Sequence, residues 1–492
     1  MIDNKVSQMS PLYKKVLIAT IIATILFTLC ARESFCDDYR QAAGLIDLRT
    51  TFSDGAYSIT ELVKMAKERG FEVVITNDHD RMVMEYGLPP FRNLLKKKVE
   101  RPSINEKGAE SYLDSINRVR GKYPGMIIIP GSETSAYYYW TGSYLKDNLT
   151  AHDHEKRILT IGMETPGDYE NLPILHNGFS SEYTSAVVFS LWMLVSLIII
   201  AASIFLLRRR GFLRITGVVS LILGIGFAFN SNPFRSSPFD QYQGYQGIAP
   251  YQLLIDYVNS RGGLTFWNYP ETRSGIRKLG PINVKTPPHP EVLEESEGYT
   301  GFAALYGDNI TVTEPGKVWD RILIQYCNGV RNRPVWGIST ADYHEEGSAG
   351  EKLGNFATVF LLREKSVKGV MEALKGGKIY AYRGRYPQLV RLDEFSVCYS
   401  DGKVAGISGD EITLKDNPRI RISISASEIP KNKVTLRLMR SGKLIGTFEE
   451  TLPLHIDYED KYYSPGKKIF YRIDMNGYGT LISNPIFVKF EG

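Results

Sequence analysis

Three long apolar runs stand out along the chain. Residues 16–31 are almost entirely apolar and follow two lysines at 14–15, which is typical of a signal peptide or signal anchor. Residues 185–207 carry no charge, and at about 1.5 Å per residue they are long enough to cross a bilayer core of about 30 Å. With a weaker run at 215–229, they predict a transmembrane helical hairpin over residues 184–230.

The positive charges orient these segments. Four arginines, at 208–210 and 214, lie in the loop between the second and third runs, and cytoplasmic loops are enriched in Lys and Arg. This loop and the lysines of the signal segment (residues 1–34) are therefore expected inside, with residues 32–184 and 231–492 extracytoplasmic. The prediction is a multi-pass membrane protein, with the membrane itself as a partner. The alternative, that the second and third runs are buried helices of a soluble domain, stays open.

Outside these runs, helical periodicity alternates with short apolar strands. Ser58 and Glu61 form a capping-box pattern that opens a helix through residue 68, and Gly70 is a typical stop. A strand over residues 71–76 follows at once. The same order of helix and strand recurs at residues 251–259 and 264–267, and at residues 319–327 and 335–338. Such alternation predicts an α/β fold with parallel strands in a barrel or an open sheet.

The pattern changes in the last hundred residues. Alternating apolar and polar positions at residues 420–425, 434–438 and 469–473 are separated by Gly, Asn, Asp and Pro, which predicts short strands. Residues 388–492 are therefore expected to form a β-sandwich. No catalytic constellation occurs there, so this part is interpreted as a packing or recognition domain.

Composition narrows the function classes. The 492 residues are 43% hydrophobic and 23% charged, which fits globular domains with some membrane and excludes a disordered chain. The net charge of +5 is small for this length, so no nucleic-acid partner is expected. The four cysteines have neither disulfide-framework nor zinc-finger spacing.

Four short polar segments follow predicted strands, where repeated strand–helix folds place catalytic loops. They are residues 46–55, 76–80, 130–133 and 339–344, and the first contains Ser53-Asp54-Gly55. Together they resemble the polymerase and histidinol phosphatase (PHP) family. The resemblance implies a distorted βα barrel of metal-dependent phosphoesterases, here split by the hairpin into residues 40–183 and 231–387.

The resemblance implies one intact metal subsite. Its ligands would be Asp54, His79 and His344, two imidazoles and a carboxylate that suit a divalent Zn, Mn or Fe. An open coordination position on such a metal lowers the pKa of bound water. Taken singly, each residue also fits a structural role, as a turn aspartate or a hydrogen-bonding histidine.

The remaining family ligands are altered. The two histidines of the family's opening motif are replaced by Asp47 and Arg49, and a later one by Tyr269. Glu133 and Asp342 are kept and are implied as metal ligands. Arg49 carries only donors and cannot ligate a cation.

Arg49 instead predicts a built-in replacement cation. Its fixed charge would compensate the carboxylates around it, and Arg49 is expected to be catalytic by stabilising a phosphoryl group. Asp78 is also expected to be catalytic. Arg273 and Arg277 are expected to bind substrate, with solvated loop charges as the alternative. The lysines at 96–98 are interpreted as a solvated helix face.

One further histidine of the family pattern is missing before the strand at residues 158–162. Arg157 lies closest to its place. His152 and His154 are near enough to substitute, although an exposed polar loop explains them equally well.

Two functions follow. The first is a membrane-anchored, extracytoplasmic phosphoesterase with a reduced metal site, acting on a phosphorylated small molecule. The second is an inactive PHP-like pseudoenzyme that serves as a ligand-binding or assembly module.

Overall fold

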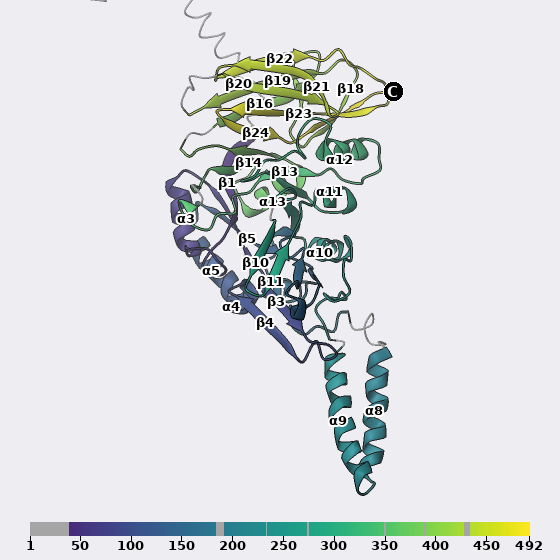
Figure 1. Cartoon of the computed structure of the whole chain (residues 1–492). Helices are drawn as coiled ribbons and strands as arrows, with labels where there is room; N and C mark the ends of the chain where they lie inside the picture. The colour runs from purple at the N-terminus through teal and green to yellow at the C-terminus, as the bar shows by residue number, and fades with distance from the viewer. Residues whose placement is uncertain are drawn as a thin grey trace, which may run out of the picture.

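The fold is mixed α/β, as the alternating pattern predicted (Figure 1). The computed structural model describes residues 39–183, 191–232, 234–272, 275–348, 351–387, 390–427 and 433–492. The predicted signal segment and the start of the second apolar run lie outside the described residues.

One large sheet runs through the molecule. Its first part has the strand order β13-β12-β9-β8-β5-β2-β1-β14-β15. These strands are β1 (Arg40–Leu48), β2 (Val73–His79), β5 (Ile127–Thr134), β8 (Arg157–Ile161), β9 (Leu264–Asn268), β12 (Gly301–Leu305), β13 (Trp336–Ser339), β14 (Phe356–Leu362) and β15 (Ile379–Arg383). Hydrogen bonds of Ser339, on β13, to Thr358 and Tyr382 bring this end of the sheet against β14 and β15.

The expectation of parallel strands holds only in part. The β1–β2, β2–β5, β9–β12 and β12–β13 pairs are parallel. In contrast, β8 lies antiparallel between β5 and β9. The chain returns from β5 to β8 through the short strands β6 (Tyr139–Thr141) and β7 (Thr150–His152), without the helical crossover that parallel neighbours require.

The predicted helices are present and flank the strands. Helix α3 (Ile59–Glu68) begins with the expected capping box of Ser58 and Glu61, and Gly70 has a φ of 82°. Helices α10 (Ala249–Ser260) and α12 (Val318–Cys327) match the other two predictions. In Figure 1, α3 and α5 (Ala109–Lys122) lie on one side of the strands, and α10 and α12 on the other.

The lysines at 96–98 correct a prediction. They lie on strand β4 (Lys96–Arg101), which pairs antiparallel with β3 (Met82–Gly87), and not on a helix. Their side chains are exposed. Alternation along a strand points Lys96 and Lys98 to the face opposite to that of Lys97.

Helices α8 (Leu191–Leu207) and α9 (Phe212–Asn230) lie side by side and project from the end opposite the C-terminal strands (Figure 1). Of the described helices, α9 is the one long and apolar enough to cross a membrane, with a mean hydropathy of 2.0. Helix α8 is shorter, with 17 described residues. Length and composition alone thus support one candidate span.

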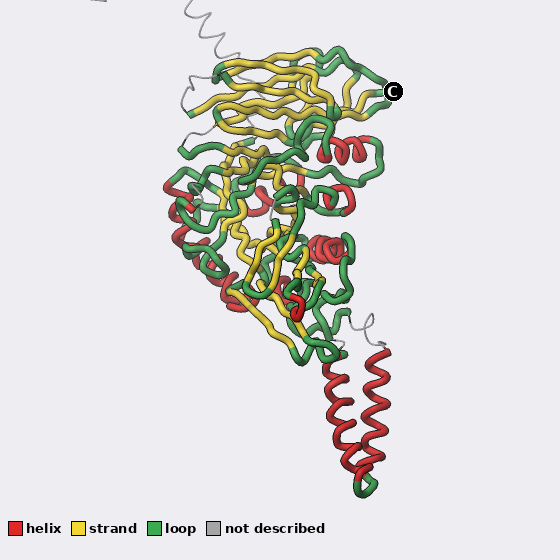
Figure 2. The backbone as a smooth tube through the Cα atoms, viewed as in Figure 1, coloured by secondary structure: helices red, strands yellow, loops and turns green. Residues whose placement is uncertain are grey.

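The C-terminal strands appear where the alternating pattern placed them (Figure 2). The three predicted strands are β19 (Arg419–Ala426), β20 (Val434–Arg440) and β23 (Lys468–Gly477). The large sheet continues into this region, because β15 pairs with β24 (Gly479–Ser483). A second sheet contains β17 (Val404–Ile407), β16 (Val390–Cys398), β19 and β22 (Leu454–Glu459).

A buried ion pair ties the C-terminal strands to α12. Arg472 on β23 and Asp320 on α12 are both fully buried, and their side chains meet in two hydrogen bonds of 2.6 and 2.8 Å. Arg472 also donates to the Thr313 carbonyl at 2.8 Å. The two regions are therefore joined both by strand pairing and by charge.

Candidate functional site

The ends of β1, β2 and β5 and the segment after β13 bring together most of the predicted site residues. His79 and Glu133 occupy neighbouring register positions on the parallel strands β2 and β5. The segment after β13 bridges to β1 through Leu48 and Tyr343. Asp342 and His344 therefore lie beside the loop that carries Asp54.

Hydrogen bonds to Asp78 hold the Ser-Asp-Gly loop in place. This fully buried carboxylate accepts hydrogen bonds from the backbone and hydroxyl groups of Thr50 and Ser53, at 2.6–3.1 Å. Gly55 packs so closely that any side chain there would collide with the Arg49 carbonyl. Asp78 was predicted to be catalytic, and in the structure its carboxylate holds the loop that carries Asp54.

Asp54, His79 and His344 form a close triad, with the carboxylate between the two imidazoles. Asp54 Oδ2 lies 3.3 Å from His79 Nε2 and 3.5 Å from His344 Nε2. Burial acts to raise the pKa of Asp54, but the hydrogen bonds from His344 and His79 outweigh it and hold that pKa well below its usual range. The carboxylate is therefore ionised.

The two imidazoles differ in charge. Burial and the neighbouring Arg157 lower the pKa of His79 to about 4, so this ring is neutral at pH 7. Burial also acts to lower the pKa of His344, but its hydrogen bond to Asp54 prevails and raises that pKa to about 9. A proton on His344 thus balances the Asp54 charge.

The donor chemistry of this triad fits a divalent metal. Two ligand atoms about 2.1 Å from a tetrahedral ion lie roughly 3.4 Å apart, close to both distances from Asp54. Nevertheless, no group of three or more His, Cys, Asp or Glu side chains within the described residues is already arranged to hold a metal ion. The triad therefore has suitable ligand atoms for a metal, but its side chains are arranged to contact one another.

Arg157, which the sequence placed nearest the missing histidine but gave no role, belongs to the site. Its NH1 atom lies 2.6 Å from His79 Nδ1 and 2.8 Å from Glu133 Oε2. Because β8 pairs with β9, Arg157 is also the cross-strand neighbour of Asn268. Its place in the motif pattern, at the missing histidine, was the available signal. His152 instead stacks on Tyr139, with ring centroids 4.8 Å apart.

Arg49 lies at the centre of a second cluster. Its guanidinium is fully buried, 2.7 Å from Asp47 Oδ1, 2.7 Å from Glu133 Oε2 and 3.3 Å from Asp342 Oδ1. It also donates to the Asn77 carbonyl. Burial opposes its charge, but the three carboxylates keep its pKa well above the ordinary value.

Polar groups complete the second cluster. Asn268 donates to Asp47 at 3.0 Å and to Glu133 at 2.8 Å, and the Tyr269 hydroxyl donates to Asp47. Burial acts to raise the pKa of Glu133, but Arg49 and Arg157 lower it to about 2. Glu133 therefore links the arginine cluster to His79, whose Nδ1 is 3.3 Å away.

Strained backbone marks the same place. Asp47, Tyr269 and Asp342 have φ values of 71°, 47° and 45°, in the left-handed region. Such conformations cost about 1–3 kcal/mol each and concentrate at functional sites. A cavity of about 440 Å³ opens beside them, and Tyr269, Tyr306, Asp342 and His344 contribute to its lining.

Neither of the two predicted substrate-binding arginines is found in the lining of this cavity. Arg277 lies on β10 (Ile276–Leu279), is exposed, and pairs with Glu155. It is not among the described residues that line the cavity. Arg273 lies outside the described residues.

No protein-family model and no curated protein matches the chain. Among solved structures, it is similar to a two-domain protein from Bacteroides vulgatus that contains a predicted PHP-like metal-dependent phosphoesterase. The two are 13% identical, with 89% of this chain and 91% of that chain covered and a TM-score of 0.35. A candidate metal-dependent phosphoesterase from Bifidobacterium adolescentis is 14% identical, covering 63% and 90%, with a TM-score of 0.29.

A third similarity concerns a smaller part of the chain. Fibronectin(III)-like modules of Clostridium thermocellum CbhA are 18% identical over 21% of this chain and 94% of that chain, with a TM-score of 0.13. The first two similar structures are PHP-like or phosphoesterase-like, which is the resemblance that the motifs indicated. At these TM-scores the likenesses carry no argument about function, which rests on the residues.

Proposed function

We propose that the chain is a membrane-anchored, extracytoplasmic, PHP-like phosphoesterase that hydrolyses a phosphorylated small molecule at a reduced metal site. The observation that carries this is the contact of one carboxylate, Asp54, with two imidazoles, His79 and His344. In this proposal residues 40–183 and 231–387 form a distorted barrel, split by the hairpin at 184–230. Residues 388–492 form the β-sandwich.

Asp54, His79 and His344 would hold the divalent Zn, Mn or Fe, which when bound supplies a water of lowered pKa. A neutral imidazole that ligates through Nε2 carries its hydrogen on Nδ1 and needs an acceptor there. Arg157, a donor only, cannot serve. Glu133 Oε2, 3.3 Å from Nδ1, is the acceptor that becomes available when Arg157 turns away.

The remaining residues provide positioning and charge. Arg49 has no exposed surface, so it acts through the carboxylates that it holds. Asp342 and His344 are partly exposed and line the cavity. Arg157 lies 2.6 Å from His79 and has 12% of its side chain exposed, so it would turn toward a phosphoryl oxygen.

The second candidate is a metal-free, PHP-like module that binds a phosphorylated ligand without hydrolysing it. Two observations favour it: Arg157 donates to the nitrogen of His79 that a metal-ligating tautomer would protonate, and Arg49 already balances Asp47 and Glu133. Both arrangements are made by protein groups alone.

Metal analysis separates the two candidates. The full chain, purified in detergent, would be assayed for bound Zn, Mn and Fe and for hydrolysis of p-nitrophenyl phosphate, before and after chelation. The phosphoesterase predicts bound metal and chelator-sensitive hydrolysis that Asp54→Asn abolishes. Absence of both from the wild-type chain, even with added metal, would leave the metal-free module.

The proposed anchor has its own test. Apolar side chains along α9, including Ile215, Ile222 and Phe229, are more than 60% exposed, which supports burial of this helix in lipid. A reporter fused after Gly492 should be extracytoplasmic, and one inserted at Gly211 cytoplasmic. The reverse result at either point would refute the topology.

A further inference from the structure

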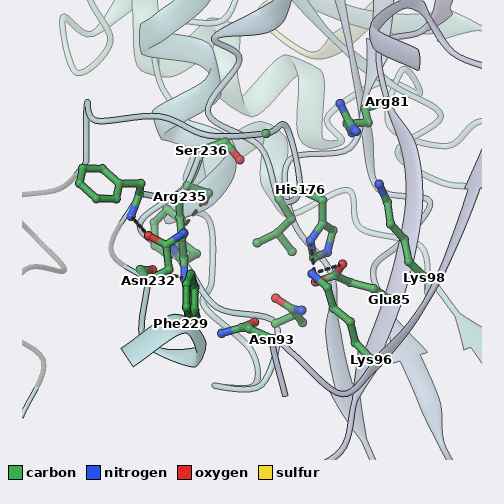
Figure 3. A pocket seen from close by; sticks show the side chains of 16 residues that line it. Arg81, Glu85, Asn93, Lys96, Lys98, His176, Phe229, Asn232, Arg235 and Ser236 are labelled. Carbon is green, nitrogen blue, oxygen red and sulfur yellow. Dashed lines mark hydrogen bonds and ion pairs between the residues drawn. The ribbon is translucent and has the colours of Figure 1, made fainter. Parts of the chain in front are cut away.

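A cavity of about 320 Å³ lies at the foot of the α8–α9 hairpin (Figure 3). On one side it is lined by the end of α9 and the segment that follows, through Phe229, Asn232 and Arg235. On the other side are the β3–β4 pair and the segment around His176. The cavity therefore lies at the level where the proposed transmembrane hairpin meets the outer domain.

The lining is rich in cations. Arg81, Lys96, Lys98 and Arg235 all line the cavity, and Glu85 is the one carboxylate among its described lining residues. Other polar donors around it are Asn93, Asn232, Ser236, Ser237 and Gln241. Charged and amide donors in a partly enclosed space are the groups that bind phosphate oxygens.

Carboxylates outside the lining orient these cations. Glu100 pairs with Arg81 at 2.8 Å and with Lys98 at 2.6 Å. Asp240 pairs with Arg235 at 2.9 Å, while Glu85, in the lining, takes Lys96 at 2.7 Å. Four cations thus share three carboxylates, which leaves excess positive charge and fixes the direction of each side chain. The Nε atom of Arg81 is buried without a hydrogen-bond partner.

An apolar rim surrounds the same place. Phe179 and Phe234 stack with ring centroids 4.6 Å apart and are 73% and 39% exposed. The turn between β3 and β4 exposes Leu88, Leu94 and Leu95.

This turn is fixed to the hairpin. Asn93 makes two hydrogen bonds to Asn230, at 2.6 and 2.9 Å, and Phe91 packs on Phe227 with ring centroids 4.7 Å apart. Exposed apolar side chains beside an apolar helix, with cations next to them, are typical of a surface at a lipid–water interface.

We propose that this cavity binds the phosphate of an anionic membrane lipid, whose acyl chains lie along α9 and the apolar rim. The site is separate from the Asp54 triad and rests only on the membrane-hairpin part of the proposed function. It makes the outer domain stand in a fixed orientation on the bilayer, because one lipid contacts α9, β4 and the segment around Arg235 together.

Strand β4 supplies a matched pair of variants. Lys98→Glu reverses one charge in the cavity, and Lys97→Glu makes the same change on the opposite face of the same strand. Both side chains are exposed, so the fold should tolerate both changes. Arg235→Gln is a second cavity variant, on a different element.

The test measures retained lipid by native mass spectrometry of the full chain in detergent. The probes are dioleoyl-phosphatidylglycerol, dioleoyl-phosphatidylcholine and glycerol 3-phosphate. The wild-type chain and Lys97→Glu should retain one phosphatidylglycerol, whereas Lys98→Glu and Arg235→Gln should retain at least tenfold less. Equal retention by the cavity variants, an equal loss in Lys97→Glu, or equal retention of phosphatidylcholine would overturn the proposal.

Glycerol 3-phosphate distinguishes a lipid from a soluble phosphate ester. It should not displace the lipid at equal concentration, and displacement would overturn the assignment to a lipid. Hydrolysis of p-nitrophenyl phosphate should be unchanged in Lys98→Glu and Arg235→Gln. Failure of lipid retention is therefore distinguishable from failure of the phosphoesterase proposal, and the Gly211 reporter tests the hairpin separately.

Discussion

Replacing Arg49 by Ala should destabilise the fold strongly. The side chain is fully buried and is shared by Asp47, Glu133 and Asp342. Its removal leaves Asp47 and Glu133 as neighbouring buried carboxylates with less compensation. Arg157 still pairs with Glu133 at 2.8 Å, and Asn268 still donates to both carboxylates. The cluster therefore loses one cation but keeps other hydrogen-bond donors.

The size of the effect follows from burial. Removing one partner of a buried ion pair typically costs about 3–5 kcal/mol, against about 0–1 kcal/mol for an exposed pair. The entropy of unfolding is about 2.1 cal/mol/K per residue, so 1 kcal/mol corresponds to about 1.6 °C of thermal midpoint for a domain of roughly 300 residues. Arg49→Ala should therefore lower the midpoint by roughly 5–8 °C. Arg419→Ala, which removes an exposed two-bond pair with Asp457, should lower it by no more than about 2 °C.

The effect should depend on pH in a defined direction. The pKa of Glu133 is lowered from 4.5 to about 2, against burial, by Arg49 and Arg157. The stabilisation from this shift is fully present above pH 4.5 and is lost as the pH falls toward 2. Asp47, whose pKa burial raises to about 6 against the effect of Arg49, loses its charge before Glu133 does. The difference between wild type and Arg49→Ala should therefore be largest at pH 7 and above, shrink as the pH falls through 6, and shrink again below pH 4.5.

Thermal unfolding of the full chain in detergent, followed by tryptophan fluorescence from pH 8 to pH 2, measures this directly. Arg49→Met separates charge from volume, because it retains most of the side-chain bulk. It should lose nearly as much stability as Arg49→Ala. A midpoint within 1 °C of wild type for both variants at pH 7 would refute the reasoning that Arg49 compensates the carboxylates.

Three further predictions use other parts of the molecule. His79→Ala should reduce bound metal relative to wild type, whereas His455→Ala, an exposed histidine on β22, should not; metal analysis checks both. Asp320→Ala should cost about 3–5 kcal/mol, because it leaves Arg472 charged and buried, and denaturant unfolding that shows less than 1 kcal/mol would contradict this. Burial acts to raise the pKa of Glu85, but its histidine and lysine partners lower it from 4.5 to about 2. The midpoint difference from Glu85→Gln should therefore shrink as the pH falls from 4.5 toward 2.

The elements that the sequence predicted well are those specified locally. The capping box of Ser58 and Glu61 and the stop at Gly70 define α3 without reference to the rest of the chain. The alternating residues of β19, β20 and β23 are similarly self-contained. Where the outcome depended on pairing, prediction failed: the lysines at 96–98 form a strand only because β3 lies beside them.

The site divides in the same way. Strand ends placed Asp54, His79 and His344 correctly in one neighbourhood, because parallel strands present their ends at one edge. The role of Arg157 was not predicted, because its contacts depend on β8 running antiparallel between β5 and β9. That pairing sets Arg157 opposite Asn268, so two residues from adjacent strands both reach Glu133.

Glu133 is the group through which the two clusters influence each other. One oxygen accepts from Asn268, while the other lies near Arg49, Arg157 and His79 Nδ1. Ligation of an ion by His79 Nε2 requires that Nδ1 donate to this second oxygen, which Arg157 now occupies. Metal binding at Asp54, His79 and His344 must therefore compete with the ion pair between Arg157 and Glu133. An anionic phosphate ester would offer Arg157 another anionic partner. Its binding would then release Glu133, which could accept from His79 Nδ1. Metal and phosphate ester should therefore bind with positive coupling.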